Sequence, residues 1–261
     1  MLQTITSRDN EKVKQYQKLG KSCKERAAAG LFTAEGVRLC CDLAQKLVCR
    51  TAFVTQKVLD THAAAAQLCA ETYVITDAVA QKMSDTKTPQ GLFCVFAMPS
   101  DEGGFTPAAV QRCLLLEQVQ DPSNVGALLR SAAAFGFDTV ILGEGCADAY
   151  GPKAVRASMS AVGALCVVQH ADIPAVCTVL RAEGVAVLAA ALYNSVPLSG
   201  VDTAAMQKIA VLIGNEGNGL SAEAVAAADM AVRIPMSDKI ESLNAAVAGS
   251  VLLWHCRGTG L

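Results

Sequence analysis

The 261-residue sequence predicts an α/β protein with two domains, the second of them built on a parallel sheet. Short, nearly uninterrupted apolar runs alternate with stretches of helical length, a pattern typical of parallel strands covered by helices on both faces. A segment rich in Gly and Pro interrupts this alternation at 99–108 and predicts a linker. We therefore expect a smaller α/β domain over 1–98 and a larger one over 109–261.

A helical spacing opens the N-terminal domain, where Val13, Tyr16 and Leu19 recur three residues apart and predict one or two helices over 8–28. Further along, Asp77 can cap a short helix that ends at Met83. The other elements expected in this domain are an extended segment at 32–36, helices at 37–47 and 62–69, and strands at 51–55, 73–76 and 92–98.

The C-terminal domain alternates between strand and helix more regularly. Its last helix is expected over 242–255 with Ser242 as the N-cap, after a polar loop at 236–241. A polar loop between a buried strand and a buried helix is where an α/β protein usually binds its ligand. The expected strands are 113–119, 139–143, 165–169, 185–191, 208–214 and 230–235, and the other expected helices are 124–135, 152–161, 172–183 and 221–227.

Composition narrows the class of protein. No apolar run reaches the roughly 18 to 20 residues that a membrane helix needs, and the N-terminus has no apolar signal core. The eleven cysteines include no Cys-x-x-Cys pair, and the three histidines are scattered. We therefore expect a cytoplasmic protein with reduced thiols, no metal site and no membrane association.

The net charge of −2 gives no general case for a nucleic-acid partner, but its distribution is uneven. From Arg8 to Arg26 there are seven basic and three acidic residues. Taken alone, such a segment is more often a solvated helix face. A basic arm is also what contacts with phosphate groups require.

Three segments carry a resemblance to a known family. The first reads Asp121-Pro-Ser-Asn-Val-Gly-Ala-Leu-Leu-Arg130 and follows an apolar run. The second reads Val211-Leu-Ile-Gly-Asn-Glu-Gly-Asn-Gly-Leu-Ser221, and the third runs from Ile234 through Ser242-Leu-Asn244. In this order they resemble the motifs of the SpoU (TrmH) family of RNA ribose 2′-O-methyltransferases, which use S-adenosylmethionine.

The N-terminal domain adds to this resemblance through segments 5–14, 32–38 and 88–91. They are similar to the substrate-binding domain often fused to this family, which has a fold like that of ribosomal protein L30e and is thought to bind RNA. For RNA contact the resemblance and the local charge together single out Arg8, Lys12, Lys14 and Arg38.

The resemblance implies a fold that the periodicity does not. Polypeptide knots are nearly absent from proteins in general, so elementary rules predict an unknotted sheet. Members of this family thread the C-terminal segment through a loop to form a trefoil knot, with loops that here correspond to 190–195, 214–220 and 234–244. They are typically homodimers whose active site is shared across the subunit interface.

The resemblance also implies a cofactor site. Gly214, Ile234 and Leu243 match cofactor positions of the family, and Leu192 and Met236 lie in the same loops. A glycine at a strand end lets a ligand lie against bare backbone, and aliphatic side chains suit an adenine slot. Without the motifs, a strand-end glycine and core aliphatic residues would be the better interpretation.

The same comparison implies catalytic roles for Asn124, Arg130, Glu216, Ser242 and Asn244. Arginine is a poor general base because its pKa lies above about 12, so we expect Arg130 to bind phosphate or stabilise alkoxide charge. Glu216 could orient Arg130 or the ribose. Asn124 could equally be a helix N-cap, and Ser242 and Asn244 could equally be ordinary helix-start residues.

The leading hypothesis is therefore 2′-O-methylation of ribosomal RNA. Transfer RNA is the alternative substrate, and a non-catalytic RNA-binding module is the alternative class. A nucleotide-dependent dehydrogenase is disfavoured, because the glycines at 214, 217 and 219 do not form Gly-x-Gly-x-x-Gly and come late in the chain.

Overall fold

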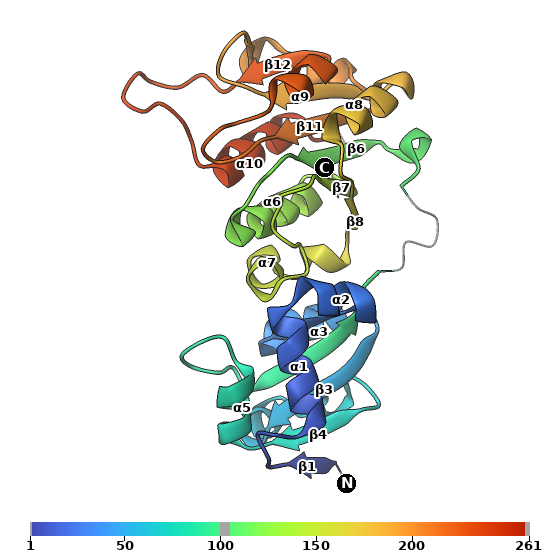
Figure 1. Ribbon diagram of the computed structural model, residues 1–261, viewed down its shortest axis with the longest axis vertical. Helices are drawn as coiled ribbons and strands as arrows, with labels where there is room; N and C mark the ends of the chain where they lie inside the picture. Colours follow the sequence, from blue (N-terminus) through green and yellow to red (C-terminus); the bar gives the residue numbers. More distant parts are fainter. Residues whose placement is uncertain (1, 100–104, 259–261) are drawn as a thin grey trace. The chain divides into compact units, whose positions relative to one another are not determined.

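The structure is a computed structural model that describes residues 2–99 and 105–258 (Figure 1). Residues 100–104 of the predicted linker lie outside the described residues, as do the chain ends 1 and 259–261. Internal contacts divide the chain into two compact units, Met1–Ser100 with Tyr150–Gly163, and Asp101–Ala149 with Ala164–Leu261. We expected 150–163 to belong to the second domain, whereas the contacts group this segment with the first. The domain bounds 1–98 and 109–261 stay a prediction.

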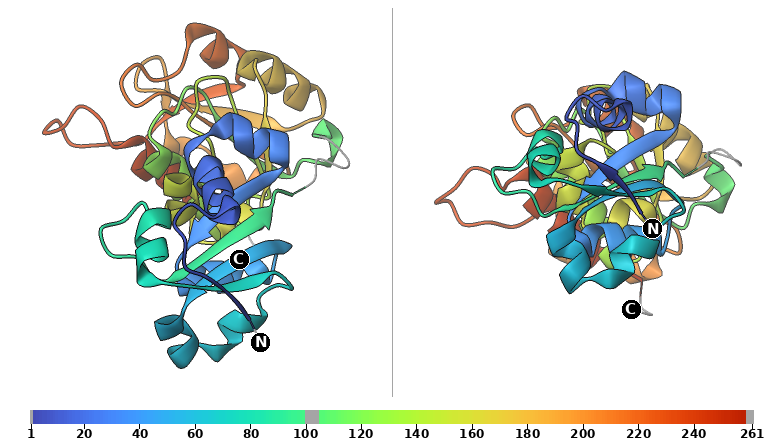
Figure 2. Two further views of the ribbon diagram at one scale, coloured as in Figure 1. Left: turned by 60° about the horizontal axis from the view of Figure 1, so that its bottom comes forward. Right: turned by 90° about the horizontal axis from the view of Figure 1, so that it is seen from below.

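The first unit is built on a mixed five-stranded sheet with the order β1-β4-β3-β5-β2. β1, β4 and β3 run parallel, and β5 pairs antiparallel with β3 and β2. Figure 2 shows helices on both faces of this sheet. The strands are β1 (Gln3–Ile5), β2 (Leu31–Glu35), β3 (Cys49–Thr55), β4 (Thr72–Ile75) and β5 (Leu92–Ala97). The helices are α1 (Glu11–Lys21), α2 (Cys23–Ala29), α3 (Val37–Ala44), α4 (Gln56–Thr61), α5 (Asp77–Met83) and α7 (Pro152–Ser158).

The apolar face predicted for the first helix is confirmed, since Val13, Tyr16 and Leu19 of α1 are all buried. The Tyr16 ring makes edge contacts with Phe53 and Phe93, at centroid distances of 6.0 and 5.8 Å. The helical segment predicted at 62–69 is a 3-10 helix over Ala63–Gln67, and α4, which ends at 61 just before it, was not predicted. β1 was not predicted because three residues carry too little periodicity.

The second unit confirms the predicted parallel sheet, with seven strands in the order β10-β12-β9-β11-β6-β7-β8. Two late strands enter between earlier ones: β11 lies between β9 and β6, and β12 lies between β10 and β9. The strands are β6 (Arg112–Leu116), β7 (Thr139–Leu142), β8 (Cys166–Gln169), β9 (Ala186–Ala190), β10 (Val196–Pro197), β11 (Ile209–Ile213) and β12 (Met230–Arg233). The helices are α6 (Pro122–Ala134), α8 (Ile173–Ala182), α9 (Ala222–Ala227) and α10 (Ala245–His255).

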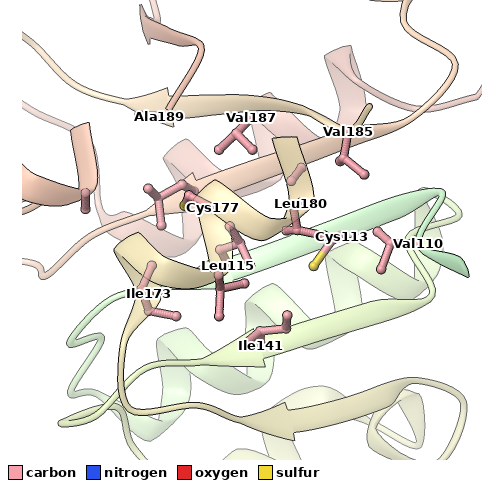
Figure 3. Close-up of a cluster of buried hydrophobic side chains, with 14 residues drawn as sticks. Val110, Cys113, Leu115, Ile141, Ile173, Cys177, Leu180, Val185, Val187 and Ala189 are labelled. Carbon is pink, nitrogen blue, oxygen red and sulfur yellow. The ribbon is translucent and has the colours of Figure 1, made fainter. Parts of the chain in front are cut away.

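Alternate residues of the central strands face opposite layers of helices. Leu115, Ile141 and Val187 join a buried cluster with Cys177 and Leu180 of α8, and Figure 3 shows these side chains between the sheet and that helix. On the opposite face α10 packs on α6 and β11. Among the described residues, no helix is long and apolar enough to cross a membrane.

The start of the last helix differs from the prediction. α10 begins at Ala245, and its N-cap is Asn244 rather than Ser242. The Asn244 Oδ1 accepts hydrogen bonds from the backbone N–H groups of Ala246 (2.9 Å) and Val247 (3.2 Å). Asparagine and serine cap about equally well, so sequence preference alone could not separate two positions this close. Residues 234–244, orange-red in Figure 1, form a long loop that extends away from the sheet before α10.

Candidate active site

The proposed cofactor residues follow three neighbouring strands of the parallel sheet. Gly214 comes directly after β11, Ile234 directly after β12, and Leu192 two residues after β9. β9 pairs with both β11 and β12, so the carboxyl ends of the three strands lie at one edge of the sheet. This is the edge at which open α/β sheets bind ligands.

Gly214 leads into a turn in which Asn215 and Gly219 exchange backbone hydrogen bonds of 2.9 and 3.0 Å. A Cβ atom on Gly214 would lie 2.4 Å from the carbonyl carbon of Gly219. The Asn215 side chain accepts hydrogen bonds from the N–H groups of Gly217 and Asn218 at 2.9 and 3.0 Å. The turn therefore has no space for a side chain at 214, and its conformation is held from within.

Glu216 reaches from this turn to the start of α6. Its carboxylate accepts hydrogen bonds from the backbone N–H of Gln120 (3.2 Å) and of Asp121 (3.1 Å). It also accepts one from the side-chain Nδ2 of Asn124 at 2.9 Å. Partial burial raises the pKa of Glu216, but the hydrogen bonds from Asn124 and from backbone N–H groups outweigh it, so the pKa lies below its ordinary value.

Asn124 connects this carboxylate to the third motif. Its Oδ1 accepts a hydrogen bond of 3.0 Å from Nδ2 of Asn244, which also caps α10. The N-cap of α6 is Asp121, so the alternative that Asn124 caps this helix is wrong. Glu216, Asn124 and Asn244 thus form one chain of hydrogen bonds that joins all three motif segments.

Arg130 lies apart from this chain of hydrogen bonds. It is an exposed residue of α6, six positions after Asn124, and the partner that the structure gives Glu216 is Asn124. Ser242 is likewise exposed, in the loop before α10, while Leu243 and Met236 are half-buried. The proposed catalytic residues therefore divide into a group joined by hydrogen bonds, 124, 216 and 244, and a group outside that network, 130 and 242.

A second carboxylate fixes the far end of the 214–221 segment, and sequence reasoning missed it. Glu117 follows β6 and accepts hydrogen bonds from the backbone N–H (2.8 Å) and the hydroxyl (2.7 Å) of Ser221. Two signals were available in the sequence. Glu117 is an acidic residue directly after an apolar run, and Ser221, much later in the chain, is a serine able to cap the helix that follows it. Gln118 adds a further tie, since its carbonyl oxygen accepts a hydrogen bond of 2.8 Å from Asn215.

In the first unit, the basic residues proposed for RNA contact differ in how they are paired. Lys12 lies 3.1 Å from Glu71 and over the ring of Tyr73, and Lys14 lies 2.9 Å from Glu11. Arg38 is 3.9 Å from Asp42. Arg8 is exposed in the turn before α1.

The fold and these residues define an α/β protein whose three motif segments meet at the carboxyl ends of parallel strands, the edge at which open α/β sheets usually bind ligands. Residues 111–254 match the model of the SpoU rRNA Methylase family, and residues 10–94 match that of the MRM3-like substrate binding domain. The chain belongs to the SpoU rRNA methylase family, which confirms the family expected from its three motifs.

Relatives of similar length extend this result over the whole chain. The chain is 31% identical over 261 residues to the 23S rRNA (guanosine(2553)-2′-O)-methyltransferase RlmP of Bacillus subtilis, covering 98% of this chain and 100% of the relative. The AdoMet-bound rRNA methyltransferase of Sinorhizobium meliloti is similar with a TM-score of 0.85 at 27% identity, covering 98% of this chain and 97% of that one. A putative RNA methyltransferase of the TrmH family from Porphyromonas gingivalis has a TM-score of 0.81 at 30% identity, covering 94% and 96%.

Proposed function

We propose that this protein transfers a methyl group from S-adenosylmethionine to a ribose 2′-hydroxyl of RNA, with ribosomal RNA as the substrate class. The observation that carries the proposal is the chain of hydrogen bonds through Glu216, Asn124 and Asn244, which brings together all three motifs beside the ligand-binding edge. The match to a 23S rRNA methyltransferase over the full length of both proteins supports the substrate class.

The residues at the strand ends fit an adenosyl ligand. Gly214 is buried, and the backbone of Gly219 fills the space where its side chain would be, so the expectation that a ligand lies against bare backbone at 214 does not fit. The glycine instead lets the 214–219 turn close at the end of β11, beside the proposed ligand position. Ile234, Leu243 and Met236 offer half-buried apolar surface, and Leu192 offers exposed apolar surface. S-adenosylmethionine, when bound, supplies an electrophilic methyl group on a sulfonium.

The roles proposed for the polar residues follow from how they are held. Arg130 projects its guanidinium into solvent, where it can bind an RNA phosphate and stabilise charge that develops on the 2′-oxygen. Asn124 and Glu216 hold the start of α6 against the 214–221 segment, and Asn244 holds the start of α10. Ser242, exposed beside this network, can hydrogen-bond the ribose.

We further propose that the protein is a homodimer that contacts its partner through α10. This helix is apolar around its whole circumference, although Val247, Val251 and Trp254 are exposed by 50%, 37% and 51%. Their spacing of four and three residues puts them on one side of the helix. Light scattering of the full chain should give a dimer, and Val247→Glu with Val251→Glu should give a folded monomer; a wild-type monomer would contradict the proposal.

Two further expectations are proposed on the same basis. The insertion of β11 and β12 between earlier strands supports a threaded C-terminal segment, and hence the trefoil knot. A crystal structure in which the segment after 234 passes outside the 190–195 and 214–220 loops would contradict it.

All eleven cysteines are free thiols, which supports a cytoplasmic location, and cell fractionation would test it.

The reaction is tested by transfer of tritiated methyl groups from S-adenosylmethionine to unmodified ribosomal and transfer RNA in separate assays. We expect alkali-stable label at one dinucleotide of ribosomal RNA, and loss of label with Asn124→Ala. Label in transfer RNA alone would show that the substrate is transfer RNA rather than ribosomal RNA. No label in either RNA, together with no binding of S-adenosylmethionine, would favour a non-catalytic RNA-binding module.

A further inference from the structure

A tyrosine with almost no burial lies in the turn between β9 and β10. Tyr193 is 83% exposed, the largest fraction among the exposed large hydrophobic side chains of the described residues. Leu192 in the same turn is 46% exposed, and Val196, the first residue of β10, is 44% exposed. Three large apolar side chains within five residues form an exposed patch that the packing of the fold does not require, and such patches often mark binding surfaces.

Hydrogen bonds hold the turn that carries Tyr193. The Ser195 hydroxyl donates to the carbonyl oxygen of Leu192 at 3.2 Å, and the Arg233 guanidinium donates to the carbonyl oxygen of Ser195. Asn194 has a positive φ of 50°, a conformation that asparagine tolerates well. An aromatic ring on a fixed turn loses less conformational entropy on binding than one on a freely moving loop.

The place of this turn in the sheet connects it to the proposed active site. It follows β9, which lies between β12 and β11, so it belongs to the same edge as Gly214 and Ile234. Leu192, the neighbour of Tyr193, is itself one of the residues proposed to contact the cofactor. A substrate whose ribose reaches the methyl donor at this edge must place its adjoining groups near the turn.

The chemistry of an RNA substrate matches an exposed aromatic ring. Proteins bind specific positions in RNA mainly where nucleotides are unpaired, and aromatic side chains stack on the freed bases. Every base has a π face, so stacking does not depend on which base is present. We propose that Tyr193 is the stacking site for an unpaired nucleobase of the RNA next to the methylated ribose; this rests on the proposed function for the identity of the substrate.

The test compares Tyr193→Ala with Tyr193→Phe in the full-length protein. The probes are a fluorescent single-stranded oligoribonucleotide for affinity and an unmodified ribosomal RNA transcript for methyl transfer. We expect Tyr193→Ala to weaken RNA binding about tenfold, within the range of about 5- to 150-fold seen for lost base stacking, and to raise KM for RNA with little change in kcat. Tyr193→Phe keeps the ring and should stay within about twofold of wild type.

Control measurements separate stacking from other roles of the turn. Val196→Ala removes exposed apolar surface, but no ring, at the start of β10 directly after the turn, and should leave RNA affinity within about twofold of wild type. All three variants should keep the wild-type melting temperature, because these side chains are largely exposed. Wild-type RNA affinity in Tyr193→Ala would overturn the inference, as would a parallel loss of S-adenosylmethionine binding or a change in oligomeric state.

Failure of the inference can be distinguished from failure of the proposed function. RNA binding that depends on Tyr193, in a protein that methylates no RNA, would refute the reaction and keep the stacking site. Methyl transfer that is unaffected by Tyr193→Ala would keep the reaction and refute the stacking site. A wild-type protein that binds no RNA would refute both.

Discussion

In the seven-stranded sheet, Gly214, Leu192 and Ile234 follow three neighbouring parallel strands, whereas in the five-stranded unit the basic residues Arg8 and Lys12 lie in a turn and on a helix. Parallel pairing brings the carboxyl ends of strands to one edge, so residues distant in sequence must meet there. The first unit has no comparable constraint on its surface charges. The function proposed for the second unit therefore rests on a few fixed positions, and the RNA contact proposed for the first rests on distributed charge.

The largest effect is expected from Arg130→Ala. This variant tests whether methyl transfer at the carboxyl edge of the sheet needs the exposed positive charge of Arg130. The rate of methyl transfer should fall at least about 100-fold, because the group proposed to stabilise developing charge is lost. The affinity for S-adenosylmethionine should stay within about twofold, since Arg130 is exposed and lies outside the network through Glu216. Arg130→Lys keeps the charge without the planar fork and should recover only part of the rate. Equal losses of methylation and cofactor binding would contradict this role.

Gly214→Ala should give the next largest effect, because it tests how rigid the edge is. The new Cβ would lie 2.4 Å from backbone of Gly219, which cannot move aside as a flexible side chain could. We expect a loss of about 2 kcal/mol in unfolding free energy and at least a tenfold weaker affinity for S-adenosylmethionine, measured by thermal melting and calorimetry.

Gly217→Ala is the matched control for this variant. A Cβ there would lie 3.5 Å from the Asn215 Oδ1, an ordinary contact. This variant should melt and bind S-adenosylmethionine like the wild type. Similar losses of stability and of cofactor affinity in both glycine variants would show that the close backbone contact at Gly214 is not the cause.

Glu216→Gln tests the carboxylate that joins the motifs and should have a moderate effect. Because hydrogen bonds hold the pKa of Glu216 below its ordinary value, its contribution to stability is present at neutral pH. This contribution is lost as the pH falls below about 4.5 through the lowered pKa. At pH 7 the variant should be less stable by about 1 kcal/mol, a modest value because Glu216 is exposed.

Urea unfolding at several pH values measures this difference. The gap between wild type and Glu216→Gln should shrink on acidification, whereas Glu223→Gln, an exposed neighbour in α9, should show a smaller gap at pH 7. A gap that grows as the pH falls would contradict the direction of the pKa shift.

The smallest effects are expected for the distributed charges of the first unit. Arg8→Ala should weaken RNA binding a few-fold and reduce the salt dependence of log K by about 0.7 to 1, as for the loss of one phosphate contact. Lys12 already pairs with Glu71 at 3.1 Å, so the charge-neutral double variant Lys12→Ala Glu71→Ala should bind RNA nearly as the wild type does. A loss as large as that of Arg8→Ala would show that Lys12 leaves Glu71 to bind phosphate.

The sequence predicted regular elements better than their ends and contacts. The parallel sheet followed from short, nearly uninterrupted apolar runs, and the buried face of α1 followed from the spacing of Val13, Tyr16 and Leu19. The N-cap at Asn244 did not follow from the sequence, because serine at 242 and asparagine at 244 are about equally good caps. The hydrogen bond from Asn244 to Asn124 did not follow either, because a pairing across 120 positions leaves no local signal. The entry of β11 between β9 and β6 was likewise not predictable, since sequential strands usually lie side by side.

The late position of β11 and Asn244 has a consequence for synthesis of the protein. A nascent chain that ends before β11 has β6 and β9 but lacks the strand that joins them. It also lacks Asn244, the partner of Asn124. The ribosome therefore releases almost the whole polypeptide before the site can assemble. Premature termination anywhere before α10 would leave translation products without the completed site, rather than partially active enzyme.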